Sequence, residues 1–141
     1  MKTASWIVLT LVAALLILGG LGSVMLAYFG SPSDDLIVGE TSLADLSIAE
    51  DAAVALRGRR GTAGSFALGY GALLLMIILG PYRKGSTWAW WALLVGAVVT
   101  SLFIYLRIPG LGIQQGSFTG SFLLIGTLIG LLLDIRRLRA A

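Results

Sequence analysis

The chain has 141 residues, of which 57% are hydrophobic and 12% are charged, and its net charge is +3. Soluble domains average about 25% charged residues, so this composition argues against an ordinary water-soluble protein. The chain has no cysteine and no histidine, which excludes disulfides, thiolate chemistry, the usual ligands of haem and zinc, and the usual general base near neutral pH. We therefore expect no cofactor and no metal site.

The first apolar run covers residues 6–29 and is long enough to cross a bilayer as a helix. It is longer than the apolar core of a signal peptide, and Met25-Leu26-Ala27 lacks the small-x-small pattern of a cleavage site. We therefore expect this run to remain in the protein as a transmembrane helix.

The segment 30–61 is predicted to be an outer loop, and it holds six of the seven acidic residues of the chain together with three arginines. Its second half, TSLADLSIAEDAAVALRGRR, places leucines at helical spacing and begins with an approximate capping box of Ser42 and Asp45. The pattern predicts an amphipathic, extracytoplasmic helix over residues 41–57, whose apolar side faces the membrane or caps the helix bundle.

Three further apolar runs follow at residues 62–79, 88–106 and 118–135, and none has a charge in its interior. Only a helix satisfies its own backbone polar groups in lipid, so each run is expected to cross the membrane as a helix. The sequence thus predicts an all-α, four-helix transmembrane bundle that forms one domain over residues 1–141.

The stretch GPYRKGSTWAWW joins the second and third runs. Gly80-Pro81 is expected to end one helix and Gly85 to turn the chain, because proline cannot continue the helical hydrogen bonds. Cations and indoles are favoured at headgroup depth. The candidate headgroup anchors are Arg83, Lys84, Trp88, Trp90 and Trp91. Simple anchoring explains them, and the alternative is that they hold an anionic lipid headgroup.

The same stretch, with the residues before it, resembles a group of small, uncharacterised four-span bacterial membrane proteins that are broadly DoxX-like. The resemblance covers residues 41–95 and centres on a YRxGxxWAW turn between the second and third helices. The matching positions are Tyr82, Arg83, Gly85, Trp88, Ala89 and Trp90. The resemblance implies a fold and a topology, and it brings no catalytic residues.

The distribution of lysine and arginine predicts the orientation. The side that holds both termini and the 80–87 turn has six cations, and the other side has four. The positive-inside rule therefore favours a multi-pass protein of the inner (plasma) membrane with both termini in the cytoplasm.

Small residues recur at four-residue spacing in the later runs, which allows helix backbones to approach closely in lipid. The sets are Ala63, Ala67 and Gly71, then Ala92, Gly96 and Thr100, and finally two pairs, Gly116 with Gly120 and Gly126 with Gly130. The simpler interpretation is packing inside one bundle. The alternative is a face for a partner protein, for which Gly126 and Gly130 are the best candidates.

No charged residue lies in the middle of a predicted span, whereas pumps, coupled transporters and voltage sensors generally need one. Asp134 is expected to pair with Arg137 at the interface. The sequence favours a non-enzymatic structural or accessory subunit that contacts membrane lipids and other membrane proteins, but no nucleic acid. A module that binds a lipid, quinone or pigment is the alternative, and an enzyme acting on lipid ranks last because no nucleophile–base pair is evident.

Overall fold

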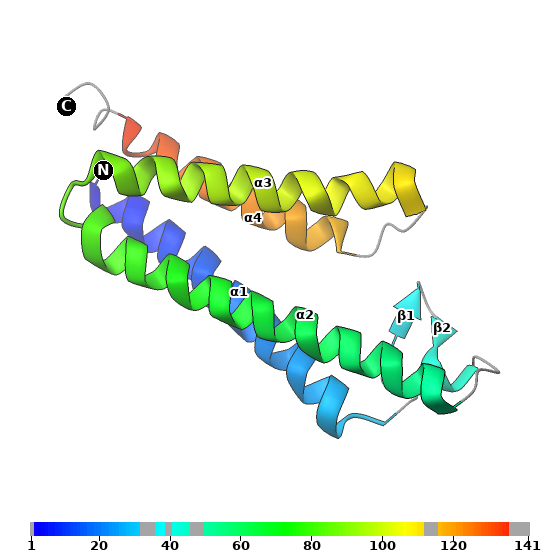
Figure 1. Ribbon diagram of the computed structural model, residues 1–141. Coiled ribbons are helices and arrows are strands. Elements are labelled where there is room, and N and C mark those ends of the chain that lie inside the picture. The colour runs from blue at the N-terminus through cyan, green and yellow to red at the C-terminus, as the bar shows by residue number, and fades with distance from the viewer. Residues whose placement is uncertain (1, 32–35, 39–40, 46–49, 112–115, 136–141) are drawn as a thin grey trace. The chain divides into compact units, whose positions relative to one another are not determined.

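The computed structural model of the chain describes residues 2–31, 36–38, 41–45, 50–111 and 116–135. Apart from one short hairpin and the connecting turns, these residues are helical. The long helices are α1 (Lys2–Phe29), α2 (Glu50–Ile77), α3 (Thr87–Leu111) and α4 (Ser117–Leu132), as Figure 1 shows. The predicted all-α class with four helices is confirmed.

Three helices are long and apolar enough to cross a membrane, over Thr3–Phe29, Ala52–Tyr82 and Thr87–Gly110. The fourth helix, α4, is apolar but has only 16 residues. At about 1.5 Å per residue it extends about 24 Å, which is less than the hydrocarbon core of a typical bilayer, about 30 Å. The helices are those of a membrane protein, and the fourth crossing stays a prediction.

The segment between α1 and α2 differs from the expected surface helix over residues 41–57. It contains an antiparallel pair of short strands, β1 (Leu36–Val38) and β2 (Thr41–Ser42), followed by a 3-10 turn, η1 (Leu43–Asp45). Residues 50–57 are helical, but they form the first turns of α2, which continues without a break into the apolar span. The helix passes through the glycines at 58 and 61. Gly61 serves packing, because a Cβ on it would lie 3.2 Å from the Tyr28 ring.

The turn between α2 and α3 is a π-helical segment, η2 (Ile78–Tyr82). Pro81 has no N–H to donate, and the amide of Arg83 donates to the carbonyl of Ile78, five residues back, at 3.1 Å. The helix therefore widens at the proline before it ends. Gly85 then closes the turn with φ 98°, a left-handed conformation that favours glycine.

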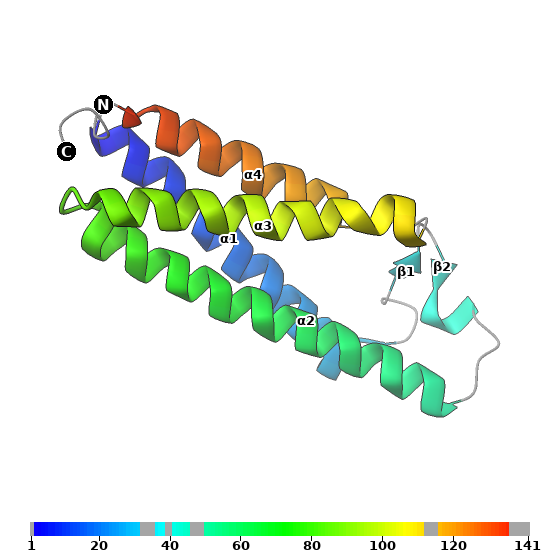
Figure 2. The same cartoon turned by 45° about the horizontal axis from the view of Figure 1, so that its top comes forward.

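Contacts divide the chain into two compact units. The first consists of Met1–Leu15 and Gly71–Ala141, and the second of Leu16–Tyr70. In the first unit α3 and α4 lie side by side and run antiparallel, as both ribbon views show (Figures 1 and 2). Bonds from Trp90 to Leu131 and from Ser101 to Gly120 join them. α3 continues through Pro109 to Leu111, five residues beyond the predicted end of this span.

In the second unit α1 and α2 approach each other at two glycines. A Cβ placed on Gly20 would lie 2.8 Å from the backbone nitrogen of Leu68 and 2.9 Å from the carbonyl oxygen of Gly64. A Cβ placed on Gly64 would in turn lie 2.9 Å from the carbonyl oxygen of Gly20. Only glycine at both positions allows the two backbones to come this close.

Candidate functional site

The first unit buries a chain of hydroxyl groups. Ser5 of α1 and Tyr82 of η2 are both 0% exposed, and their hydroxyl oxygens are 2.5 Å apart. The Ser5 hydroxyl also donates to the carbonyl oxygen of Gly130 in α4 at 2.7 Å. A serine hydroxyl has a single proton, so Tyr82 must be the donor in the bond to Ser5. The chain runs from Tyr82 to Ser5 to Gly130 and links three elements.

The Gly130 carbonyl lies in the last turn of α4, where carbonyls lack an intrahelical partner. The neighbouring carbonyl, that of Leu131, accepts a bond from the indole Nε1 of Trp90 at 3.3 Å. Trp90 is only 6% exposed, so its predicted role as a headgroup anchor is corrected. The Leu131 carbonyl also accepts the Asp134 amide at 3.1 Å, so the indole N–H is its second donor and joins α3 to the end of α4.

The other predicted anchors keep positions on the surface. Arg83 is exposed, and its guanidinium carbon lies 4.7 Å from the ring centroid of Trp6. Lys84 is exposed as well, and so are Trp88 and Trp91. Side chains of these types at the end of an apolar helix suit the interface between lipid and water. Their contact with headgroups stays a prediction.

Asp134 follows α4 and is buried, with 4% of its surface exposed. Its amide donates to the carbonyl of Leu131 at 3.1 Å. Its predicted partner, Arg137, lies outside the described residues, so that ion pair stays a prediction. Among the residues that the structure describes, no three acidic side chains gather into a group that could hold a metal ion.

Two of the predicted interface glycines face α1 inside the first unit. A Cβ on Gly126 would lie 2.6 Å from Cγ2 of Val12, and a Cβ on Gly130 would lie 2.7 Å from Cγ and Cδ2 of Leu9. A side chain of α1 thus fills the space beside each of these two glycines. Of the two interpretations of these glycines, the geometry fits the internal one.

The remaining two glycines of this set have different surroundings. Gly120 lies against α3, where a Cβ would meet Cγ2 of Ile104 at 3.0 Å, and its carbonyl accepts the hydroxyl of Ser101 at 3.0 Å. Gly116 precedes α4 with φ 90°, a conformation that glycine adopts at no steric cost. Gly120 therefore serves packing, and Gly116 starts the helix.

The Tyr82→Phe variant tests the hydroxyl chain. We expect it to lower the free energy of unfolding by about 0.6–1.7 kcal/mol, between the average and the largest value for interhelical hydrogen bonds in membranes, because it removes the donor to Ser5. Titration with SDS, followed by tryptophan fluorescence, measures the change. The control is Tyr105→Phe, which removes an exposed hydroxyl bonded to Ser121 and should cost less. Equal losses in the two variants would contradict a special role for the buried chain.

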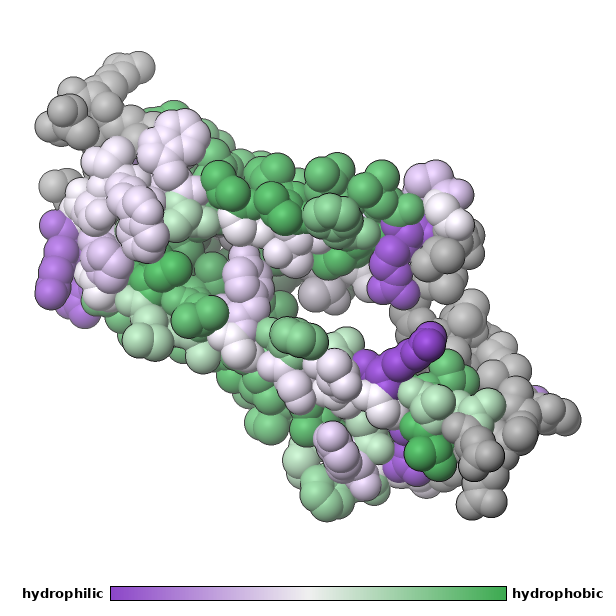
Figure 3. Space-filling view, viewed as in Figure 1, coloured by the Kyte–Doolittle hydropathy of each residue, from purple (hydrophilic) through white to green (hydrophobic). Residues whose placement is uncertain are grey.

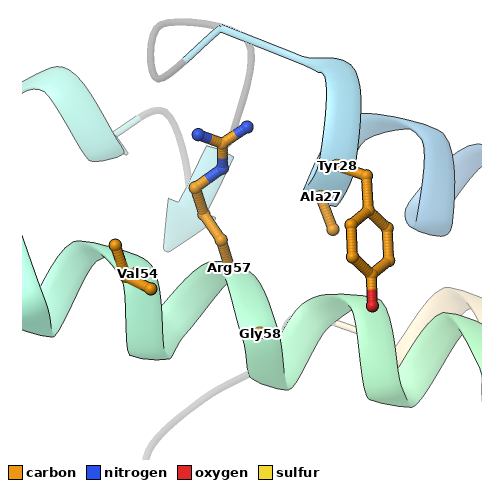
Figure 4. A pocket seen from close by; sticks show the side chains of 5 residues that line it. All are labelled: Ala27, Tyr28, Val54, Arg57 and Gly58. Atoms are coloured by element: carbon orange, nitrogen blue, oxygen red, sulfur yellow. The ribbon is translucent and has the colours of Figure 1, made fainter.

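The second unit contains an open cavity of about 250 Å³ between the end of α1 and the first half of α2. Figure 4 shows Val54 and Arg57 rising from α2, with Ala27 and Tyr28 reaching from α1. Gly58 completes the lining, and space around it is open, since a Cβ there would meet no atom within 4 Å. Among the described residues, its lining therefore combines one cation and one phenol with small or apolar side chains.

Arg57 also stabilises the end of α1. Its Nη2 donates to the carbonyl oxygen of Gly30 at 2.7 Å, and a cation is favoured at the C-terminal end of a helix. The sequence places this arginine at the end of a separate surface helix and gives no sign of this contact. The hint available was the cluster of three arginines just before the second apolar run.

Comparison with family models, with curated proteins and with solved structures finds no match for this chain. The resemblance to DoxX-like proteins therefore stays a prediction.

Proposed function

We propose that this chain is a non-enzymatic integral membrane protein that serves as a structural or accessory subunit and meets a partner membrane protein with α3. The observation that carries the proposal is a stripe of large exposed side chains on α3. Successive members are three or four residues apart, so they share one side of the helix. The stripe consists of Trp88, Trp91, Val95, Val98, Leu102 and Tyr105.

The opposite side of α3 supports the proposal. It is buried in the first unit and consists of Ala89, Leu93, Ala97 and Ser101, at four-residue spacing. α3 thus buries one side and presents a row of large side chains on the other, where Figure 3 shows a continuous apolar surface along its middle. In lipid, van der Waals packing between side chains is one source of helix association.

A photo-crosslinking experiment tests the partner surface. Benzoylphenylalanine at Val98 in native membranes is expected to give a protein adduct of one defined mass, because a docked partner fixes what the side chain touches. The same probe at Leu11, an exposed position on α1, is the control and is expected to label lipid. Lipid adducts alone at Val98, or identical products at both sites, would argue against docking through α3.

The proposed setting is the plasma membrane of a bacterium with both termini in the cytoplasm. The excess of lysine and arginine on that side, six against four, supports this orientation. The resemblance of the 41–95 segment to four-span bacterial proteins supports the bacterial membrane and the four crossings.

A second function, the binding of a lipophilic small molecule, is favoured by one observation. The cavity beside Arg57 and Tyr28 has mostly apolar or small walls and one cation. Binding sites for small molecules commonly have this character, with a few polar groups that orient the ligand. The partner proposal on α3 does not depend on this cavity.

A further inference from the structure

The cavity of the second unit has a cation whose hydrogen-bonding capacity is only partly used by the fold. A guanidinium carries five N–H donors, and the bond from Arg57 to Gly30 uses one of them. Arginine binds phosphate oxygens through two parallel N–H bonds, a geometry that adds strength and specificity. Among the residues that the structure describes, none of those lining the cavity is acidic. The group that complements it is therefore an anion, and a phosphate fits the donor arrangement.

The sequence position of the cavity indicates its depth in a membrane. The apolar stretch of α1 ends at Phe29, one residue after Tyr28. In α2, three arginines at 57, 59 and 60 precede the uncharged stretch of the span. Arginine is costly at the bilayer centre and lies near the interface, where tyrosine is also enriched. The lining residues thus belong at the level of the lipid headgroups.

The size of the cavity limits what enters it. A volume of about 250 Å³ suits a headgroup and not a whole lipid. An acyl chain has a separate path, because Leu21 and Met25 are exposed on α1 and share one side of the helix with Tyr28. Headgroup and tail can therefore be accommodated on the same unit.

From these observations we infer that the cavity binds the phosphate of an anionic phospholipid headgroup, with Arg57 as the phosphate ligand and the acyl chain along Leu21 and Met25. This inference rests on the second proposed function and names its ligand class. It is independent of the partner surface on α3, which the crosslinking experiment tests separately.

The test uses the full chain in mild detergent, titrated with phosphatidylglycerol or with phosphatidylcholine and followed by native mass spectrometry. The unaltered chain should retain phosphatidylglycerol in preference to phosphatidylcholine. Gly58→Leu fills the cavity where a side chain meets no atom, and it leaves the bond from Arg57 to Gly30 in place. The leucine should keep the lipid phosphate away from Arg57. Phosphatidylglycerol binding should therefore weaken about tenfold, as expected when a charge-assisted hydrogen bond from Arg57 to the phosphate is lost.

Two further variants separate the cavity from general attraction of charge. Arg57→Lys keeps the charge but loses the two-pronged geometry, so binding should fall between the unaltered chain and Gly58→Leu. Arg59→Gln removes an exposed cation outside the lining and should leave phosphatidylglycerol binding within twofold of the unaltered value, since surface charge contributes little.

Three outcomes would overturn the inference. The first is unchanged lipid binding in Gly58→Leu, and the second is an equal loss in Arg59→Gln. The third is displacement of phosphatidylglycerol by inorganic phosphate at equal concentration, which would make free phosphate the ligand. Binding of a neutral lipophile in place of the anionic lipid would leave the second proposed function standing while removing this inference.

Discussion

Replacing Gly20 with alanine is expected to destabilise the α1–α2 pair of the second unit by about 1–3 kcal/mol, the typical cost of overpacking. The added methyl group would lie 2.8 Å from the Leu68 nitrogen and 2.9 Å from the Gly64 carbonyl oxygen. Both are backbone atoms, so neither can rotate away and the helices must separate. The free energy of unfolding in an SDS titration measures the effect, and Gly64→Ala should give a similar loss.

The matched control is the neighbouring glycine. A Cβ on Gly19 would meet no atom within 4 Å, and alanine favours a helix over glycine by about 1 kcal/mol. Gly19→Ala should therefore leave stability unchanged or raise it. A loss in Gly19→Ala as large as in Gly20→Ala would show that the close crossing is not what makes Gly20 necessary.

Replacing Gly126 with leucine is the second change with a large expected effect. The new side chain would enter the contact between α4 and α1, where a Cβ already lies 2.6 Å from Val12 Cγ2. We expect a loss of about 1–3 kcal/mol in the free energy of unfolding, and Gly130→Leu should behave alike because Leu9 occupies the same space around it.

Ile129→Phe serves as the control for Gly126→Leu, since it enlarges a side chain that is 50% exposed on the same helix. It should change stability little. If Gly126→Leu instead left the free energy of unfolding unchanged and released a bound partner, the side of α4 with Gly126 and Gly130 would be a docking surface. The interpretation as internal packing would then be wrong.

The existence of the long helices could be predicted from the sequence because the length of an apolar run reports directly on membrane thickness. The start of α2 could not. The sequence predicted a separate helix over residues 41–57 and a span that begins at residue 62, yet one helix runs through both, and its Gly61 lies under the Tyr28 ring. Whether a glycine ends a helix or serves packing depends on a neighbour that is distant in the sequence.

The side that each helix buries was predicted less well. In α2 the sequence favoured a stripe that includes Ala63, but that residue is exposed while Gly61 and Gly64 are buried. In α3 the predicted Ala92, Gly96 and Thr100 are half-buried, and the buried row is Ala89, Leu93 and Ala97. Lipid-facing and inward-facing sides are both apolar in a membrane helix, so periodicity does not separate them.

The hydroxyl chain had no signal in the sequence. Ser5 and Tyr82 are 77 positions apart, and both lie near the ends of spans, where polar residues are ordinary. The three tryptophans around position 90 looked alike as interfacial residues, and only the packing of α3 on α4 places the indole of Trp90 inward and leaves those of Trp88 and Trp91 exposed.

The bonds at the end of α4 have a consequence for the rotational register of that helix. Its sides are apolar almost throughout, so dispersion forces alone discriminate weakly between one rotation and the next in lipid. A shift by one residue turns a helix by about 100° and moves it about 1.5 Å. Such a shift would carry the Gly130 and Leu131 carbonyls away from Ser5 and Trp90 together. Two hydrogen bonds donated from two different helices therefore act with the close contacts at Gly126 and Gly130 to select a single register.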